Sequence, residues 1–298
     1  MAAVHGRSVK IRGRHLFYFS FSQFILYLFL ALLVLFTALP LIYVVSTAFK
    51  PMDELFLFPP KFLTNRPVLD NFYGLFASLD NASVPFTRYI FNSLVTSLAV
   101  VTGTTVVSTM AAYGLVKHKP AGSGFIFSLI LAALMFSAHV TQIPNYMVVE
   151  GMGLLNSYWA LILPKVATAF NMFLMKQFME QMPDEYIEAA RIDGANEFQI
   201  FMKIACPFVK PAMATLVVFT FVGTWNDYFS PLIFTNSNAM KTLPLAIQSI
   251  AGGPGAASLA TAGTMAAASF VMIIPTVAIY SAMQSKVINT MSYSGIKG

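Results

Sequence analysis

The chain has 298 residues, of which 57% are hydrophobic and only 10% are charged, and its mean hydropathy is +0.70. Soluble domains carry about 25% charged residues, so this composition excludes an ordinary soluble domain and indicates an integral membrane protein. The formal net charge is +6, but basic residues at the edges of membrane spans explain such an excess. Beyond the first fifteen residues, no basic run with interleaved aromatic residues supports a nucleic-acid partner.

Apolar segments long enough to span a bilayer, which takes about 20 residues, recur along the chain. We predict six transmembrane helices, at Ile25–Val45, Tyr89–Val116, Phe125–Met147, Tyr158–Met175, Ala212–Phe234 and Thr264–Met283. The first apolar run is longer than the core of a signal peptide, so we expect it to be retained. The predicted fold class is therefore an all-α integral membrane protein.

The distribution of lysine and arginine predicts the orientation of these spans. With the basic N-terminal tail inside, 12 Lys and Arg residues fall on the cytoplasmic side, five fall outside and Lys165 falls within a span. This asymmetry follows the positive-inside rule. Six spans then place both termini in the cytoplasm.

The predicted organisation has four parts. They are a cytoplasmic tail at 1–24, the first helix with an outer loop at 25–88, a core membrane domain at 89–284 and a cytoplasmic tail at 285–298. We expect residues 46–88 to form a partly ordered outer cap. The outer stretch at 235–263 contains the glycine-rich run Ala251–Ala257. That run fits a segment that becomes ordered on a partner and fits a disordered connector equally well.

One polar loop at 176–210, inside the core domain, stands out from the apolar sequence. It holds six of the chain's 12 acidic residues: Glu180, Asp184, Glu185, Glu188, Asp193 and Glu197. The local signals predict a helix–turn–helix. Pro183 suits a first helical position, Gly194 suits the left-handed residue after a helix, and Asn196 can cap a second helix that Pro207 and Pro211 interrupt.

On the first of these helices, Tyr186, Ala189, Ala190 and Asp193 are expected to share one face. Small alanines flanked by charges suit a short helix that sits in a groove of a cytoplasmic protein. The alternative is an amphipathic hairpin on the membrane surface, but anionic inner leaflets repel so acidic a segment.

The spacing in this loop resembles the EAA loop of the permeases of binding-protein-dependent ABC importers. The residues that carry the resemblance are Glu188, Ala189, Ala190, Gly194, Ile204, Cys206 and Pro207. Cys206 stands where the usual pattern has leucine, which is an apolar exchange. Other stretches are similar to the carbohydrate branch of the family, especially its maltose-type second permease: Ser46–Lys50, Phe58–Pro60, Leu155–Pro164 and Gly223–Tyr228.

The resemblance implies a permease subunit that forms half of the translocation path for a carbohydrate, in a bacterial inner membrane. It implies a second permease subunit, two ATP-binding subunits and a periplasmic or lipoprotein solute-binding protein as partners. The chain has no P-loop pattern, so we expect ATP and magnesium on the partner subunits, and neither a cofactor nor catalysis in this chain. The implied ATPase-coupling residues are Tyr186, Glu188, Ala189, Ala190, Arg191, Asp193 and Gly194.

Polar residues at membrane depth are candidates for the substrate path. We single out Asn226, Asp227, Lys165 and Gln142. Asp227 is expected near the outer half of the fifth span, where it either lines a cavity or makes a packing contact. Lys165 either attracts an anionic group of a substrate or pairs with a carboxylate of the sister permease.

Two other classes of protein are compatible with an apolar chain of this length. A secondary transporter or channel subunit can also span six times, but it is expected to show paired intramembrane charges or repeated broken helices and needs no EAA loop. A membrane enzyme is disfavoured because no metal-ligand cluster or nucleophile–base set lies in a span. The sequence leaves the carbohydrate open, including whether it is acidic.

Overall fold

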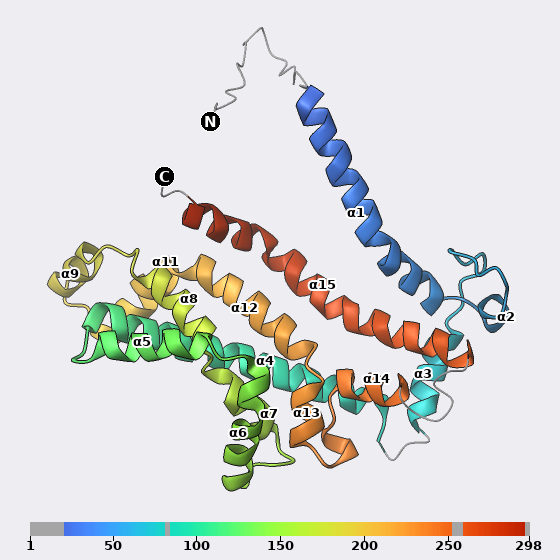
Figure 1. Cartoon of the computed structure of the whole chain (residues 1–298). Helices are drawn as coiled ribbons and strands as arrows, with labels where there is room; N and C mark the ends of the chain where they lie inside the picture. Colours follow the sequence, from blue (N-terminus) through green and yellow to red (C-terminus); the bar gives the residue numbers. More distant parts are fainter. Residues whose placement is uncertain (1–20, 81–83, 252–258, 296–298) are drawn as a thin grey trace.

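The computed structural model describes residues 21–80, 84–251 and 259–295, and every regular element within these ranges is a helix (Figure 1). The N-terminal half contains α1 (Phe21–Ala48), α2 (Met52–Leu55), α3 (Asp70–Asp80), α4 (Phe86–Tyr113), the π-helix η1 (Gly114–His118), α5 (Ser123–Leu134) and α6 (Ala138–Gly151). The remainder contains α7 (Tyr158–Val166), α8 (Ala169–Met179), α9 (Glu185–Ile192), α10 (Glu197–Ile200), the π-helix η2 (Phe201–Ala205), α11 (Cys206–Phe208), α12 (Lys210–Trp225), α13 (Phe229–Phe234), the 3₁₀-helix η3 (Asn238–Met240), α14 (Leu243–Ala251) and α15 (Leu259–Gly295).

Within the described ranges, three continuous helices are long and apolar enough to cross a membrane: α1, α4 with η1, and α15. They correspond to the first, second and sixth predicted spans. The sixth is longer than predicted, because α15 continues to Gly295 through residues that we expected to form a tail. Most of the N-terminal tail and most of the glycine-rich run at Ala251–Ala257 lie outside the described residues.

The third, fourth and fifth predicted spans are not continuous helices. The third bends by 114° between α5 and α6, because Ser137 starts a new helix by accepting a hydrogen bond from the backbone N–H of His139. The fourth bends by 41° between α7 and α8. Pro164 lies inside α7 rather than at this bend, and the chain turns at Ala167 and Thr168.

The fifth predicted span, Ala212–Phe234, is divided into α12 and α13. Asn226 to Tyr228 separate these two helices. If each bent pair of helices is counted as one span, the chain reaches up to six spans, and the third such pair joins the helix at Glu197–Phe208 to α12 at an angle of 74°.

Helix α4 is the central element, with α12, α8 and α7 packed against it. Its small and hydroxyl-bearing residues allow this close approach, as is usual for helices in lipid. A Cβ atom added at Gly103 would lie 2.9 Å from Cγ2 of Val166 on α7. Thr104 and Ser108 are fully buried, and the Thr104 hydroxyl donates to the carbonyl of Lys165 over 3.1 Å.

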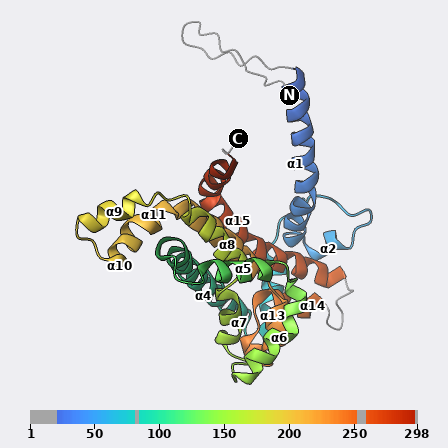
Figure 2. The same cartoon turned by 60° about the vertical axis from the view of Figure 1, so that its left-hand side comes forward.

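The two largest of three clusters of buried apolar residues in the described ranges lie towards opposite ends of the molecule. One cluster joins the end of α1 to α3, α12, α14 and α15, and includes Trp225 and Leu243. The other joins the end of α4 to α8, α9 and α12, and includes Met175, Ile187 and Ile200. Figures 1 and 2 both show α9 and α11 at one end of the molecule and α2 at the other.

Candidate functional site

The polar loop forms the predicted helix–turn–helix, with one boundary corrected. Helix α9 begins at Glu185 after Asp184, so Pro183 lies just before the helix and not at its first position. Gly194 has a φ of +80°, the left-handed conformation that was predicted for it. Asn196 caps α10 in a capping box with Gln199, which satisfies two backbone N–H groups at the helix start.

The second helix of the loop passes through Pro207, where we expected an interruption. A proline cannot donate the usual backbone hydrogen bond and its ring crowds the preceding turn. The turn before it widens into the π-helix η2, and Pro207 then lies in the first turn of α11. The chain breaks instead at Val209, and Pro211 lies in the first turn of α12.

The four residues expected on one face of α9 are divided between two faces. Ala190 is only 8% exposed, because it packs with Ile187 into the core cluster beneath the loop. Tyr186, Ala189 and Asp193 are exposed. Two further apolar side chains, Ile192 on α9 and Phe198 on α10, are 86% and 72% exposed. The sequence reading missed both, although each stands as an apolar residue on a short polar helix.

Of the other coupling residues, Glu188 and Arg191 are exposed on α9, as is Gly194 after it. The exposed side of the loop is therefore mixed. It presents alanine, tyrosine and isoleucine between charged groups, while the opposite side packs on the protein's own core.

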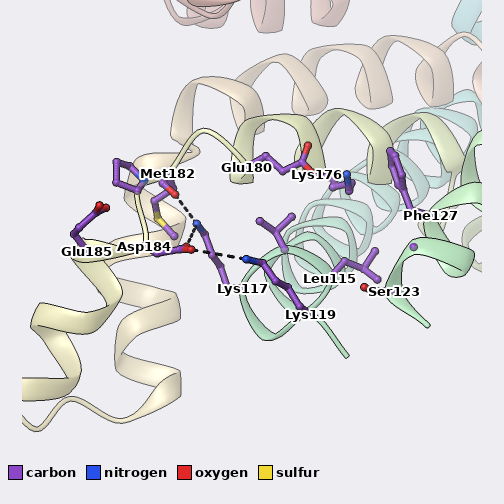
Figure 3. Close-up of a pocket in the computed structure, with 13 residues that line it drawn as sticks. Leu115, Lys117, Lys119, Ser123, Phe127, Lys176, Glu180, Met182, Asp184 and Glu185 are labelled. Atoms are coloured by element: carbon purple, nitrogen blue, oxygen red, sulfur yellow. Dashed lines mark hydrogen bonds and ion pairs between the residues drawn. The ribbon is translucent and has the colours of Figure 1, made fainter. Parts of the chain in front are cut away.

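A lysine of η1, directly after α4, holds the N-terminal end of α9 (Figure 3). The Lys117 side chain is 4% exposed, and its Nζ donates to the carbonyl of Met182 and, over 2.6 Å, to Oδ1 of Asp184. Lys119 lies 3.9 Å from the other carboxylate oxygen. The hydrogen bond and charge of Lys117 lower the pKa of Asp184 below its ordinary value of 3.8.

The C-terminal end of α9 is held to the same region through Glu197. Arg191 donates to Oε1 of Glu197 over 2.8 and 3.1 Å. The hydroxyl of Tyr113, the last residue of α4, donates to Oε2 over 3.0 Å, and His118 Nε2 lies 3.4 Å from that oxygen. Both ends of α9 are thus tied to the end of α4 and to η1. Sequence reasoning did not find this link, since its members are more than sixty positions apart.

A hollow of about 750 Å³ lies beside the loop, between η1, the start of α5, the end of α8 and the entry to α9 (Figure 3). Lys176 lies over the ring of Phe127 at 3.6 Å and pairs with Glu180 at 2.6 Å. The lysines around the hollow each have a carboxylate partner, so its walls carry opposite charges in balance.

Two of the predicted path residues form an ion pair with each other. Lys165, in the last turn of α7, donates to Oδ2 of Asp227. We expected Lys165 to meet either a substrate anion or a carboxylate of a sister subunit, but the partner that the structure shows is in the same chain. Oδ1 of Asp227 accepts from the backbone N–H groups of Phe229 and Ser230, over 2.9 and 3.1 Å.

Asp227 is therefore placed differently from the expectation of a continuous fifth span. Its carboxylate satisfies backbone donors at the start of α13, which explains why the span divides there. The ion pair joins this break to the last turn of α7, just before the bend between α7 and α8. It thereby connects two points where the helices are interrupted.

Lys165 lies between two cavities. One, of about 190 Å³, is lined by α6, α7 and α13, and both Gln142 and Lys165 border it. The other, of about 280 Å³, is bordered by Lys165, Asn171 and Gly223. Asn226 borders neither cavity, and its side chain donates back to the carbonyl of Val222 over 2.9 Å. Lys165 thus pairs with Asp227 and shares a cavity with Gln142, whereas Asn226 has neither of these links.

This architecture defines a class: a multi-pass membrane protein whose acidic helical loop is anchored to its central helix and exposes one side to solvent. The chain belongs to the family described as "Binding-protein-dependent transport system inner membrane component", which it matches over residues 1–289. The family predicted from the loop is therefore confirmed. Members of this family are the permease components of ABC importers and are not themselves catalytic.

Relatives and a solved structure agree with this assignment. The chain is 29% identical over 287 residues to the arabinooligosaccharides transport system permease protein AraQ of Bacillus subtilis strain 168, covering 96% of this chain and 99% of AraQ. It is 34% identical over 235 residues to the polygalacturonan/rhamnogalacturonan transport system permease protein YtcP of the same strain, covering 76% and 77%. A chain of a bacterial ABC transporter that imports the acidic polysaccharide alginate has the same fold, with a TM-score of 0.77, 23% identity and coverage of 90% and 98%.

Proposed function

We propose that this protein is the transmembrane permease subunit of an ATP-driven ABC importer and forms half of the translocation path for a carbohydrate. The observation that carries the proposal is the acidic loop, whose helix α9 has one exposed side and is tied at both ends to α4 and η1. Its relatives' names specify oligosaccharide and polysaccharide transport systems.

The coupling role follows from how α9 is held. Because Lys117 and Glu197 fix both ends of α9 to the end of α4 and to η1, a force on the exposed side of α9 is passed to the central helix. Helices α7, α8 and α12 pack on α4, so they would move with it. ATP-driven closure of the ATPase pair would in this way change the side on which the path opens.

The residues that we assign to the ATPase contact are Tyr186, Glu188, Ala189, Arg191 and Asp193, with Gly194 allowing the chain to reverse. Ala190 supports this contact surface indirectly, because its side chain is buried against the core of the loop itself. A bulky change at Ala190 would therefore disturb the loop itself, and Ala189 is the better position for testing contact with a partner.

For the path, we assign Lys165 and Gln142, which border one cavity, and Asp227, which pairs with Lys165. A sugar hydroxyl can accept a hydrogen bond from a lysine and donate one to a carboxylate, so this ion pair suits a carbohydrate. An acidic sugar can bind here only by competing with Asp227 for Lys165. Asn226 is the weakest of the four assignments, because it borders neither cavity and its side chain donates back to its own helix, whereas Asp227 pairs with Lys165.

The other subunits of the importer are proposed from the family to which the chain belongs. They are a second permease subunit, two ATP-binding subunits that hold ATP and magnesium, and a periplasmic or lipoprotein solute-binding protein; we assign no cofactor to this chain. We further propose six spans in the bacterial inner membrane, in which α5 with α6, α7 with α8 and α12 with α13 each count as one, with both termini and the α9 loop in the cytoplasm.

One observation favours a second candidate function, a secondary transporter. Paired charges at membrane depth are typical of that class, and Lys165 and Asp227 form such a pair. The family match and the acidic loop oppose it. The two functions differ in their energy source, which is ATP for the importer and an ion gradient for the secondary transporter.

Co-purification followed by reconstitution tests the proposal. The chain, tagged and expressed with its neighbouring genes, should bring down a sister permease and an ATPase. In proteoliposomes with the solute-binding protein, we expect a saccharide to stimulate ATP hydrolysis. Uptake that is driven by a proton or sodium gradient in the absence of ATP would contradict the importer and support the second candidate.

A further inference from the structure

Residues 50–66, which follow α1, are held together by buried hydrogen bonds on the side that faces the protein. The Lys50 side chain, 2% exposed, donates to the carbonyl of Lys61 over 2.6 Å. Glu54 is 4% exposed and accepts from the hydroxyl of Thr64 over 2.9 Å. Buried hydrogen bonds to charged groups are strong, so they fix the shape of residues 50–66.

The outer side of the same segment is strongly apolar. Phe56, Leu57, Phe58, Phe62 and Leu63 are all exposed, and Phe58 is 94% exposed. Lys61 is the one charged residue between positions 55 and 63. Contiguous exposed apolar surface of this kind marks a place where a protein meets another apolar phase or partner.

The segment also turns back along α1. The backbone N–H of Thr64 donates to the Ser46 hydroxyl over 3.0 Å, and the rings of Phe62 and Tyr43 lie 5.6 Å apart. Tyr43 precedes the end of α1 by five residues, or about 8 Å at 1.5 Å per residue. Phe62 and Leu63 therefore lie beside the membrane-length helix and not beyond its end.

The position of the segment indicates what covers it. Figures 1 and 2 both show it on the flank of α1 that faces away from α4 to α13. There it continues the apolar surface of α1, whose Leu41 and Ile42 are also exposed. These two residues and Leu63 line a groove of about 460 Å³ between α1 and the segment.

We propose that residues 55–63 are an interfacial membrane anchor that inserts into the lipid leaflet at the end of α1 opposite the α9 loop. The phenyl rings and leucines enter the boundary between headgroups and acyl chains, where aromatic side chains are favoured. Lys61 extends its ammonium group towards the lipid phosphates. In this proposal residues 55–63 lie in lipid, within the stretch 46–88 for which the sequence predicted a partly ordered outer cap.

The anchor also explains the rigid inner side. Helix α1 packs chiefly on α15, and its buried residues, Ser46 to Ala48, lie only at its end, so most of its length has no buried residue that would set its depth in the membrane. A rigid segment in the lipid interface, whose shape is fixed by the hydrogen bonds of Lys50 and Glu54, would set this depth. This inference does not depend on what the protein transports.

Spin-label accessibility in the assembled, reconstituted transporter tests the anchor. The label is placed at Phe58→Cys or Leu63→Cys, with Cys206→Ser and with the cysteines of the other subunits replaced. The matched control is Asn65→Cys, an exposed polar position on the same segment. We expect labels at 58 and 63 to collide with oxygen and to lose collisions with a water-soluble nickel chelate, whereas the label at 65 shows the reverse.

Two results would overturn the proposal. Free access of the nickel chelate to position 58 would show that the segment lies in water. Low access of both oxygen and the chelate would show that a protein covers it, such as the sister permease; if the low access occurs only after the solute-binding protein is added, that protein is the cover. Both positions are exposed, so the substitutions leave the buried framework intact.

Discussion

At the scale of single residues, the ion pairs of the α9 loop distinguish two groups of residues. One group holds α9 in position, and the other is left free to contact a partner protein. Asp184 and Glu197 are engaged with groups of α4, η1 and α9 itself. Tyr186, Ala189 and Ile192 are exposed on the outer side of the same helix. The residues of this loop therefore divide into acidic ones that hold α9 in place and largely apolar ones that are left exposed for a partner.

The Lys117–Asp184 pair makes the position of α9 depend on pH. Because the folded-state pKa of Asp184 lies below its ordinary value of 3.8, the pair stabilises the folded loop fully above that value and is lost as the pH falls through the lowered pKa. We expect a spin label at Glu188→Cys to keep its mobility down to about pH 4 and to become more mobile as the pH falls further, through the lowered pKa.

Two variants separate this effect from general acid unfolding. Asp184→Asn should be mobile across the whole range, whereas Asp193→Asn should behave as the unmodified protein. Equal mobility of the unmodified protein and Asp184→Asn at neutral pH would contradict the anchoring role of Asp184.

At the scale of elements, the sequence predicted the helices better than their interruptions. The caps and the glycine of the loop were readable because Asn196 and Gly194 act on their immediate neighbours. The break at Asp227 was not readable, because apolar residues continue on both sides and the carboxylate acts through local hydrogen bonds that composition does not reveal. The pairing of Lys165 with Asp227 depends on how α7 and α12 pack on α4, which is a tertiary property.

The ion pair that joins α7 to the break between α12 and α13 predicts a non-additive pair of mutations. Removing one partner of a largely buried pair leaves a charge uncompensated, which costs about 3–5 kcal/mol. We expect Lys165→Gln and Asp227→Asn each to lower the thermal stability of the assembled transporter, and the double variant to recover most of the loss. Asparagine keeps an oxygen for the N–H groups of Phe229 and Ser230, so the start of α13 is preserved.

Thermal unfolding of the four proteins in this cycle, with Lys165→Arg as the charge-retaining control, measures the coupling. Effects of the two single changes that simply add would show that the pair does not hold these helices together. Substrate-stimulated ATP hydrolysis on the same samples shows whether the pair also acts in transport.

At the scale of the whole molecule, the two largest apolar clusters lie at opposite ends, and each supports a segment with a different proposed role. The cluster under α9 makes the loop and the end of α4 one packed unit. The cluster at the other end joins α1, α3, α14 and α15, next to the segment proposed to anchor in lipid. Helix α4 runs between them, so a movement imposed on α9 has a continuous route towards Lys165.

The contact between α9 and an ATP-binding subunit is the central claim, and site-specific photo-crosslinking tests it most directly. A benzophenone amino acid is placed at Ala189 in the assembled transporter, with Met147 as the matched exposed control, on α6 outside the loop. We predict that position 189 forms an adduct with the ATP-binding subunit and that position 147 does not. An adduct of position 189 with lipid, or with the sister permease alone, would contradict the account.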